Sequence, residues 1–213
     1  MKKTYFVLIS IAVLISCREN RKISEQQTES GKEPGKLELL LTFPVDTVID
    51  FYDLSNDSIR EFPDLSVYTI KSLDLSHNEI DTFIVDFLPK GIEKLNLSNN
   101  LLRNFYILEI KPPSNNLKEI DASHNRISSV SIGVPIRKIN ASHNELTSIS
   151  FSHKNIEYVD VSYNPNLSNV VGFDPYKIDT VIHNNIANNR KLIYIGSIGP
   201  EHVDYIIISD SVN

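Results

Sequence analysis

One short motif recurs along this chain and constrains its fold more than any other feature. The octapeptide LDLSHNEI at residues 73–80 returns as LNLSNNLL at 95–102, IDASHNRI at 120–127 and INASHNEL at 139–146. Every copy keeps two apolar residues, a serine, an asparagine and a final apolar residue at the same spacing, while the letters between them change. Such a frame predicts one backbone conformation used repeatedly, with the variable side chains facing solvent.

The frame runs from about residue 45 to residue 190 when each segment is aligned on its asparagine. Apolar residues stand at set distances before and after that position in most segments. The aligned positions are 19 to 25 residues apart and hold Asp57, Asn78, Asn100, Asn125, Asn144, Asn164 and Asn184. Because an ionised carboxylate only accepts hydrogen bonds, we expect Asp57 to face a cap or water.

The resulting pattern, L-x-x-L-x-L-x-x-N-x-L, resembles the leucine-rich repeat family, especially the short-repeat bacterial type of internalin-like proteins. The resemblance implies a leucine-rich repeat solenoid over residues 37–213. It would be mainly β, with a curved parallel sheet on the concave side, extended or 3₁₀ segments on the convex side, and a cap at each end. A structural asparagine ladder would satisfy turn amides and carbonyls through Asn78, Asn100, Asn125, Asn144, Asn164 and Asn184.

Three rows of side chains are predicted to face the concave side, at six, four and two positions before the aligned asparagine. The outer row, six before, is Phe51, Ser72, Lys94, Glu119, Lys138 and Tyr158. The middle row, four before, is Asp53, Asp74, Asn96, Asp121, Asn140 and Asp160. The serine row, two before, is Ser55, Ser76, Ser98, Ser123, Ser142 and Ser162. We expect the middle and serine rows to form a polar floor, and the varied outer row to carry specificity.

No catalytic site, metal site or cofactor is predicted. The middle row has no calcium-loop spacing, and Asn96 and Asn140 interrupt carboxylate repulsion as a structural ladder would. Histidines precede the aligned asparagine in four repeats, so His124 and His143 would be neighbours able to share a zinc ion. Catalytic zinc usually takes three protein ligands, which favours an exposed rim of histidines over a metal site. Nucleophile-elbow, zinc-protease and phosphate-loop motifs do not occur in the sequence.

The first residues resemble a lipoprotein export signal. Lys2 and Lys3 precede an apolar run at residues 5–15, and Leu14-Ile15-Ser16-Cys17 resembles the lipobox of bacterial lipoproteins. The resemblance implies a signal peptide at 1–16 and lipidation of Cys17. The alternative is a chance cysteine beside an ordinary signal peptide or a short N-terminal anchor. Residues 18–36 contain one large apolar residue, Ile23, so residues 17–36 are predicted to be a flexible tether.

These features predict a lipid-anchored cell-envelope module that binds a protein or an envelope glycan through its concave face. Removal of Lys2 and Lys3 from the 21 basic residues leaves 19 against 27 acidic ones, a formal charge of −8. Such a charge repels phosphate backbones, so nucleic acid is not an expected partner. The residue after Cys17 is Arg18 rather than the aspartate that resembles an inner-membrane retention signal in some bacteria. We therefore expect the outer membrane, with the periplasmic or surface side left open. The alternatives are a structural envelope spacer without a ligand and a metal-dependent enzyme.

Overall fold

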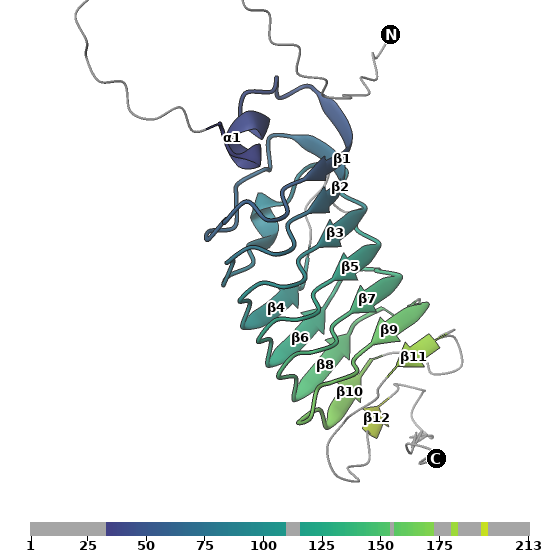
Figure 1. Ribbon diagram of the computed structural model, residues 1–213. Coiled ribbons are helices and arrows are strands. Elements are labelled where there is room, and N and C mark those ends of the chain that lie inside the picture. The colour runs from purple at the N-terminus through teal and green to yellow at the C-terminus, as the bar shows by residue number, and fades with distance from the viewer. Residues whose placement is uncertain (1–32, 110–115, 154–155, 173–179, 183–192, 196–213) are drawn as a thin grey trace, which may run out of the picture.

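A computed structural model describes residues 33–109, 116–153, 156–172, 180–182 and 193–195. The predictions for the signal peptide, Cys17, most of the tether, His183, Asn184 and the end of the tail lie outside these residues. The described chain winds into a solenoid whose coils stack along one axis (Figure 1). The predicted leucine-rich repeat solenoid is confirmed.

The predicted concave sheet has seven strands, all of them parallel. In spatial order they are β1 (Val48–Asp53), β2 (Thr69–Asp74), β3 (Lys94–Asn96), β5 (Glu119–Asp121), β7 (Lys138–Asn140), β9 (Tyr158–Asp160) and β11 (Thr180–Ile182). The strand register follows the sequence frame, since Ser72 pairs with Lys94 and Lys94 pairs with Glu119. Equivalent residues of successive repeats therefore lie side by side in straight rows.

The return segments form a second parallel sheet on the other side of the solenoid (Figure 1). Its strands are β4 (Asn104–Ile107), β6 (Ser129–Ile132), β8 (Ser148–Phe151), β10 (Asn169–Val171) and β12 (Ile193–Ile195). The extended segments expected on the convex side thus pair with one another, which the sequence did not predict. An earlier return segment instead holds the short 3₁₀ helix η1 (Val85–Phe87).

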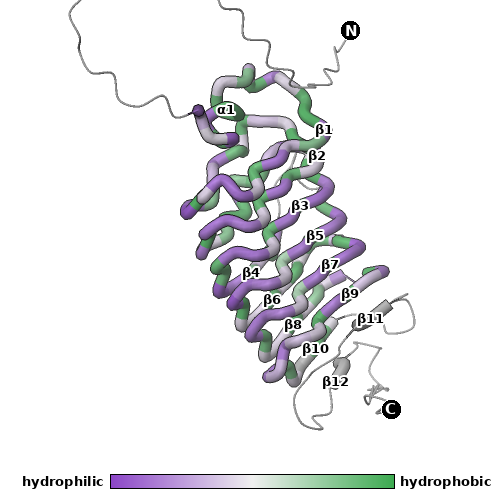
Figure 2. The backbone as a smooth tube through the Cα atoms, viewed as in Figure 1, coloured by the Kyte–Doolittle hydropathy of each residue, from purple (hydrophilic) through white to green (hydrophobic). Residues whose placement is uncertain are grey.

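The apolar core lies between the two sheets. Phe105 from β4 is fully buried and contacts Phe83, with ring centroids 4.7 Å apart; Phe83 in turn contacts Phe62 at 5.2 Å. Hydropathy alternates along each coil, and the hydrophilic stretches repeat from coil to coil (Figure 2). Because each repeat buries its apolar row only against its neighbours, the stack is the stable unit.

A short helix, α1 (Lys36–Leu40), covers the first coil. The two carboxylate oxygens of Asp57 accept the backbone N–H groups of Lys36 at 3.0 Å and Leu37 at 2.9 Å. Asp57 therefore faces the N-terminal cap, where a group with two acceptors satisfies the free amides at the start of a helix. Within the described part of the chain, no helix has the length and apolar character needed to cross a membrane.

Candidate binding face

The asparagine ladder holds the turn after each concave strand. In Asn125, Nδ2 donates to the carbonyl oxygens of Leu97, Ala122 and Ser123 at 3.0 to 3.1 Å, while Oδ1 accepts the N–H of Leu102 at 3.0 Å. The same arrangement recurs, with both donors and the acceptor used, at Asn78, Asn100, Asn144 and Asn164. Each side chain joins its own repeat to the preceding one, which fixes where the concave strands end.

The residue before each ladder position has a left-handed backbone conformation. Its φ lies between 53° and 56° at Asn56, His77, Asn99, His124, His143 and Tyr163. Asparagine and histidine adopt this region more readily than most residues with a side chain. The recurring histidine therefore occupies a position where the turn geometry selects the residue type.

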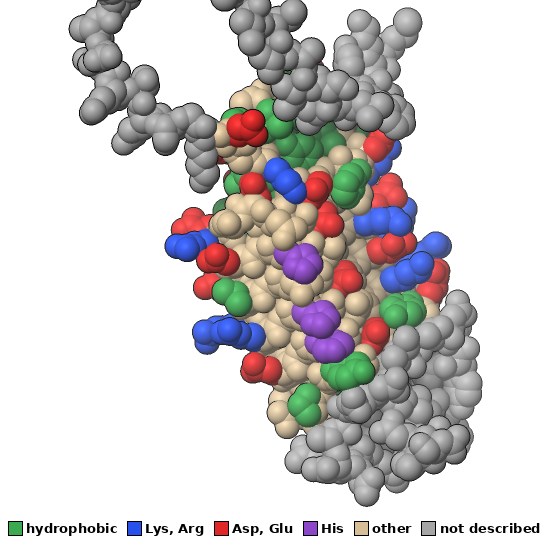
Figure 3. All heavy atoms as spheres, in the orientation of Figure 1, with side chains coloured by type: hydrophobic (Ala, Val, Ile, Leu, Met, Phe, Trp, Pro, Cys, Tyr) green, Lys and Arg blue, Asp and Glu red, His purple; other side chains and the backbone are tan. Residues whose placement is uncertain are grey.

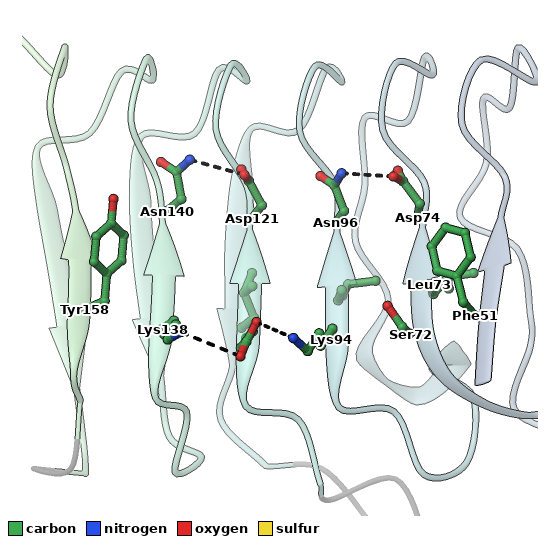
Figure 4. Close-up of a pocket in the computed structure, with 13 residues that line it drawn as sticks. Phe51, Ser72, Leu73, Asp74, Lys94, Asn96, Asp121, Lys138, Asn140 and Tyr158 are labelled. Carbon is green, nitrogen blue, oxygen red and sulfur yellow. Dashed lines mark hydrogen bonds and ion pairs between the residues drawn. The ribbon is translucent and has the colours of Figure 1, made fainter.

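The concave sheet carries a groove of about 330 Å³ that crosses its strands from β1 to β9 (Figure 4). All six outer-row residues line it, together with four of the middle row, namely Asp74, Asn96, Asp121 and Asn140. Asp53 and Asp160 are not among its lining residues. Leu73, Leu95 and Ile120 form its apolar base, and the sequence frame already marked their positions as apolar.

Every middle-row side chain makes the same bond to the backbone. Its Oδ1 accepts the N–H of the serine two residues later, at 2.8 to 3.1 Å, as in Asp121 with Ser123 and Asn140 with Ser142. This bond closes a local turn in which aspartate and asparagine are equivalent acceptors. The second polar atoms form pairs between strands, since Nδ2 of Asn140 donates to Oδ2 of Asp121 at 3.2 Å (Figure 4).

Beyond the first repeat, the serine row is not part of the exposed floor that the sequence predicted, whereas Ser55 of the first repeat is half-buried. Ser76, Ser98, Ser123, Ser142 and Ser162 are at most 8% exposed. The concave strands end at the middle row, and beyond it the backbone turns inward through the left-handed residue. Three of the hydroxyls donate to the middle-row oxygen above them, as in Ser123 to Asp121 at 2.6 Å. The exposed polar surface therefore consists of the middle and outer rows.

The outer row is charged at its centre and aromatic at both ends. Glu119 lies between two lysines, 3.0 Å from Nζ of Lys94 and 3.9 Å from Nζ of Lys138 (Figure 4). Phe51 is 58% exposed at one end, and Tyr158 is half-buried at the other. Burial and the neighbouring Asp160 carboxylate raise the pKa of the Tyr158 phenol. Solvated ion pairs contribute little to stability, so a ligand could displace them at small cost.

An edge row, one position before the outer row, is neutral overall. It is made of three ion pairs between adjacent strands, with distances of 2.7 to 3.3 Å: Asp50 with Lys71, Glu93 with Lys118, and Arg137 with Glu157. At the end of the middle row, Asp53 also has a basic partner, Nζ of Lys36 at 2.9 Å. Burial opposes ionisation of Asp53, but hydrogen bonds from Ser55 and Lys36 outweigh it and lower the pKa of the carboxyl.

A ring ladder lies on the turns next to the concave sheet. The rings of His124 and His143 stack with centroids 4.1 Å apart, and those of His143 and Tyr163 at 4.0 Å. Histidine side chains are exposed along this face (Figure 3). Stacked rings point their nitrogen lone pairs side by side rather than toward one point, which does not suit a shared zinc ion. The described residues contain no group of three or more side chains able to hold a metal.

Comparison with known proteins identifies one repeat. A sequence model of the family described as Leucine Rich Repeat matches residues 69–90, the segment that contains β2, Asn78 and η1. No curated protein matches the chain. The matched repeat and the solenoid together support a place in the leucine-rich repeat family.

Proposed function

We propose that this protein is a binding module that recognises a partner protein through the groove on its concave face. Leucine-rich repeat solenoids are in general protein-binding scaffolds and are typically not enzymes. The observation that carries the proposal is the groove itself, in which a varied outer row stands on a uniform backbone frame. The exposed Phe51 and the ring of Tyr158 supply aromatic contacts of the kind that dominate protein interfaces.

The finer part of the proposal places the module in a bacterial cell envelope, anchored by a lipid on Cys17 and held by the tether at residues 17–36. Its support is the order of charge, apolar run and cysteine in the first seventeen residues. Fractionation of cells tests it, because Cys17→Ala should move the protein from the membrane to the soluble fraction and abolish acylation measured by mass spectrometry. Absence of an acyl group on Cys17 of the wild-type protein would contradict the lipid anchor. The same proposal includes an outer-membrane location. An envelope glycan is the alternative ligand to a protein.

Affinity capture from an envelope extract tests the concave face. The bait is the full-length protein, and the test variant combines Lys94→Glu, Lys138→Glu and Tyr158→Ala. The matched control combines Lys71→Glu, Lys118→Glu and Tyr106→Ala, which changes the same charge and one exposed tyrosine outside the groove. We expect a partner that the wild type and the control retain and the test variant loses. Equal recovery by all three would favour a structural spacer.

A further inference from the structure

The negative charge of the middle row exceeds what the fold requires. Oδ1 of Asn140 accepts the N–H of Ser142 at 3.1 Å and its hydroxyl at 2.8 Å. Oδ1 of Asp160 makes the same two bonds to Ser162, at 3.0 Å and 2.7 Å. An amide oxygen therefore serves this turn as well as a carboxylate does, and the charges of Asp74, Asp121 and Asp160 are available for another role.

These three aspartates stand on alternate strands. Asp74 is on β2 and Asp121 on β5, while the intervening strands β3 and β7 carry Asn96 and Asn140 (Figure 4). Asp160 is on β9, the strand after β7. Neighbouring strands are about 4.8 Å apart, so the carboxylates repeat every ~9.6 Å across the sheet. Oδ2 accepts one side-chain hydrogen bond in each of the three: from the asparagine of the next strand in Asp74 and in Asp121, at 3.2 Å, and from the Tyr158 hydroxyl in Asp160, at 3.4 Å. Each Oδ2 keeps a further lone pair.

The surrounding charges leave this acidic row to set the sign of the face. Two lysines and Glu119 in the outer row have one net positive charge, the edge row is neutral, and Asp53 is paired with Lys36. Asp74 and Asp121 line the groove, and Asp160 lies next to Tyr158 at its end. The three negative charges of these residues exceed the single net positive charge of the outer row. Charge complementarity calls for a cationic partner.

The spacing selects the conformation of that partner. A polyproline II chain places every third residue on the same side, about 9.3 Å apart, and over two repeats it departs from the carboxylate spacing by about 0.6 Å. Same-face residues of a β-strand recur at about 6.6 Å and do not match. Residues seven apart in an α-helix recur at about 10.5 Å, which accumulates an error of about 1.8 Å over two repeats.

We propose that the concave face binds an extended polyproline II segment of the partner protein, with lysine or arginine at every third position, running across the strands from β2 to β9. The inference rests on the proposed function and names the chemistry of its ligand. The basic side chains meet Asp74, Asp121 and Asp160. The rings of Phe51 and Tyr158 at the two ends of the groove contact the apolar positions of the segment, as aromatic grooves generally do with proline-rich chains.

Fluorescence anisotropy with labelled peptides tests this proposal. The probe is a Lys-Pro-Pro repeat peptide, and its control has the same composition with the lysines clustered at one end. We expect the full-length protein to bind the regular peptide at least about tenfold more tightly than the clustered one, with affinity that falls as salt rises. A neutral β-1,4-linked oligosaccharide serves as the glycan probe and is expected not to bind.

Matched variants locate the binding. The combination Asp74→Asn, Asp121→Asn and Asp160→Asn should weaken the regular peptide about tenfold or more, because it removes charge and keeps the turn acceptors. The control combination Asp50→Asn, Glu93→Gln and Glu157→Gln removes equal charge from the edge row, outside the groove, and should weaken the regular peptide clearly less than the aspartate combination does. Comparable unfolding transitions in denaturant would show that all three proteins are folded.

Equal affinity for the two peptides, peptide binding unchanged by the aspartate variants, or binding of the oligosaccharide in place of the peptide would each overturn the inference. The capture experiment separates this failure from failure of the proposed function. If the outer-row variant loses its partner while the regular peptide does not bind, the groove is a protein-binding site for another ligand. If neither effect is found, both proposals fail.

Discussion

Two asparagines of the third coil, Asn96 and Asn100, have different tasks. Asn100, in the buried ladder, donates to the carbonyl oxygens of Leu75 and Leu97 and accepts the N–H of Ile80. Asn96, in the middle row, accepts the N–H of Ser98 and directs its amide group to the neighbouring Asp74 at the surface. The ladder position uses donors and an acceptor in the interior, whereas the middle-row position must supply only an acceptor.

The difference explains which position varies. A buried site that needs donors and an acceptor together admits asparagine and excludes a carboxylate. A half-exposed site that needs one acceptor admits aspartate or asparagine, so charge can be placed there without disturbing the turn. The fold therefore requires asparagine in the buried ladder. In the middle row it accepts aspartate or asparagine, so ligand binding can determine which of the two is present.

The ladder should show the largest effect. Asn125→Asp places an acceptor-only group against the three carbonyl oxygens that now accept from Nδ2, at a site that is 9% exposed. We expect a loss of about 3 to 5 kcal/mol in the free energy of unfolding, because buried polar groups lose their partners. Urea unfolding followed by circular dichroism measures it. A loss below about 1 kcal/mol would show that the ladder hydrogen bonds contribute little to the stability of the solenoid.

Asp57 is the exception to asparagine in the ladder, and it tests the comparison between buried ladder and middle-row positions. Asp57 occupies the ladder position of the first repeat and accepts two N–H groups of the cap helix. Asp57→Asn would turn one acceptor into a donor that faces a donor, so we expect a cost of about 1 to 2 kcal/mol. Hydrogen exchange should increase at residues 36–41. Asp46→Asn, at an exposed site before β1, serves as control, and equal effects of both changes would argue against a specific role of Asp57.

The sequence predicted the solenoid and the concave rows because both follow from short-range periodicities. The ladder residues recur at nearly constant intervals, and side chains alternate along each Leu-x-Leu segment. The prediction from this alternation that the serine row is exposed was wrong. Ser123 is buried because it comes after the last residue of β5, where the chain has already begun to turn. The alternation of side chains predicts which residues are exposed only within the bounds of a strand.

Two other features depend on contacts that no single repeat encodes. The second sheet forms because return segments such as Ser129–Ile132 and Ser148–Phe151 lie in register from coil to coil. The left-handed backbone at His124 and His143 is visible in the sequence only as a preference for asparagine or histidine. The histidine rings stack because equivalent residues of successive repeats lie side by side. The hydrogen bonds from Asn96 and Asn140 to the neighbouring carboxylates depend in addition on side-chain orientation, which the sequence does not reveal.

The ring ladder should give a smaller, pH-dependent effect. Burial and the neighbouring His124 lower the pKa of His143 below its usual 6.5, and the Asp160 carboxylate opposes them. The unfolded chain then binds more protons as pH falls through 6.5, so this contribution to stability is complete above that value and is lost as pH falls through the folded pKa. We expect the melting temperature to decrease slightly on acidification for this reason.

A variant isolates that contribution. His143→Asn should make the melting temperature less dependent on pH between neutral and mildly acidic conditions, since Asn99 shows that asparagine suits the same backbone conformation. Thermal unfolding at a series of pH values measures the slope. His77→Asn is the control, because its neighbours in the row are Asn56 and Asn99 rather than rings. The same change in slope for both variants would assign the effect to histidine titration in general rather than to the stack.

The middle row should show the smallest effect on stability. Asp160→Asn keeps the acceptor for Ser162, and Asn140 already performs this task one strand away. We therefore expect the free energy of unfolding to change by no more than about 0.5 kcal/mol, as for an ordinary surface substitution. Urea unfolding beside Asn125→Asp makes the contrast direct, since the two changes interconvert the same two residue types in opposite directions. A loss of about 2 kcal/mol or more would mean that the carboxylate is required by the fold, and the alternation of aspartate and asparagine would then have a structural rather than a ligand-binding cause.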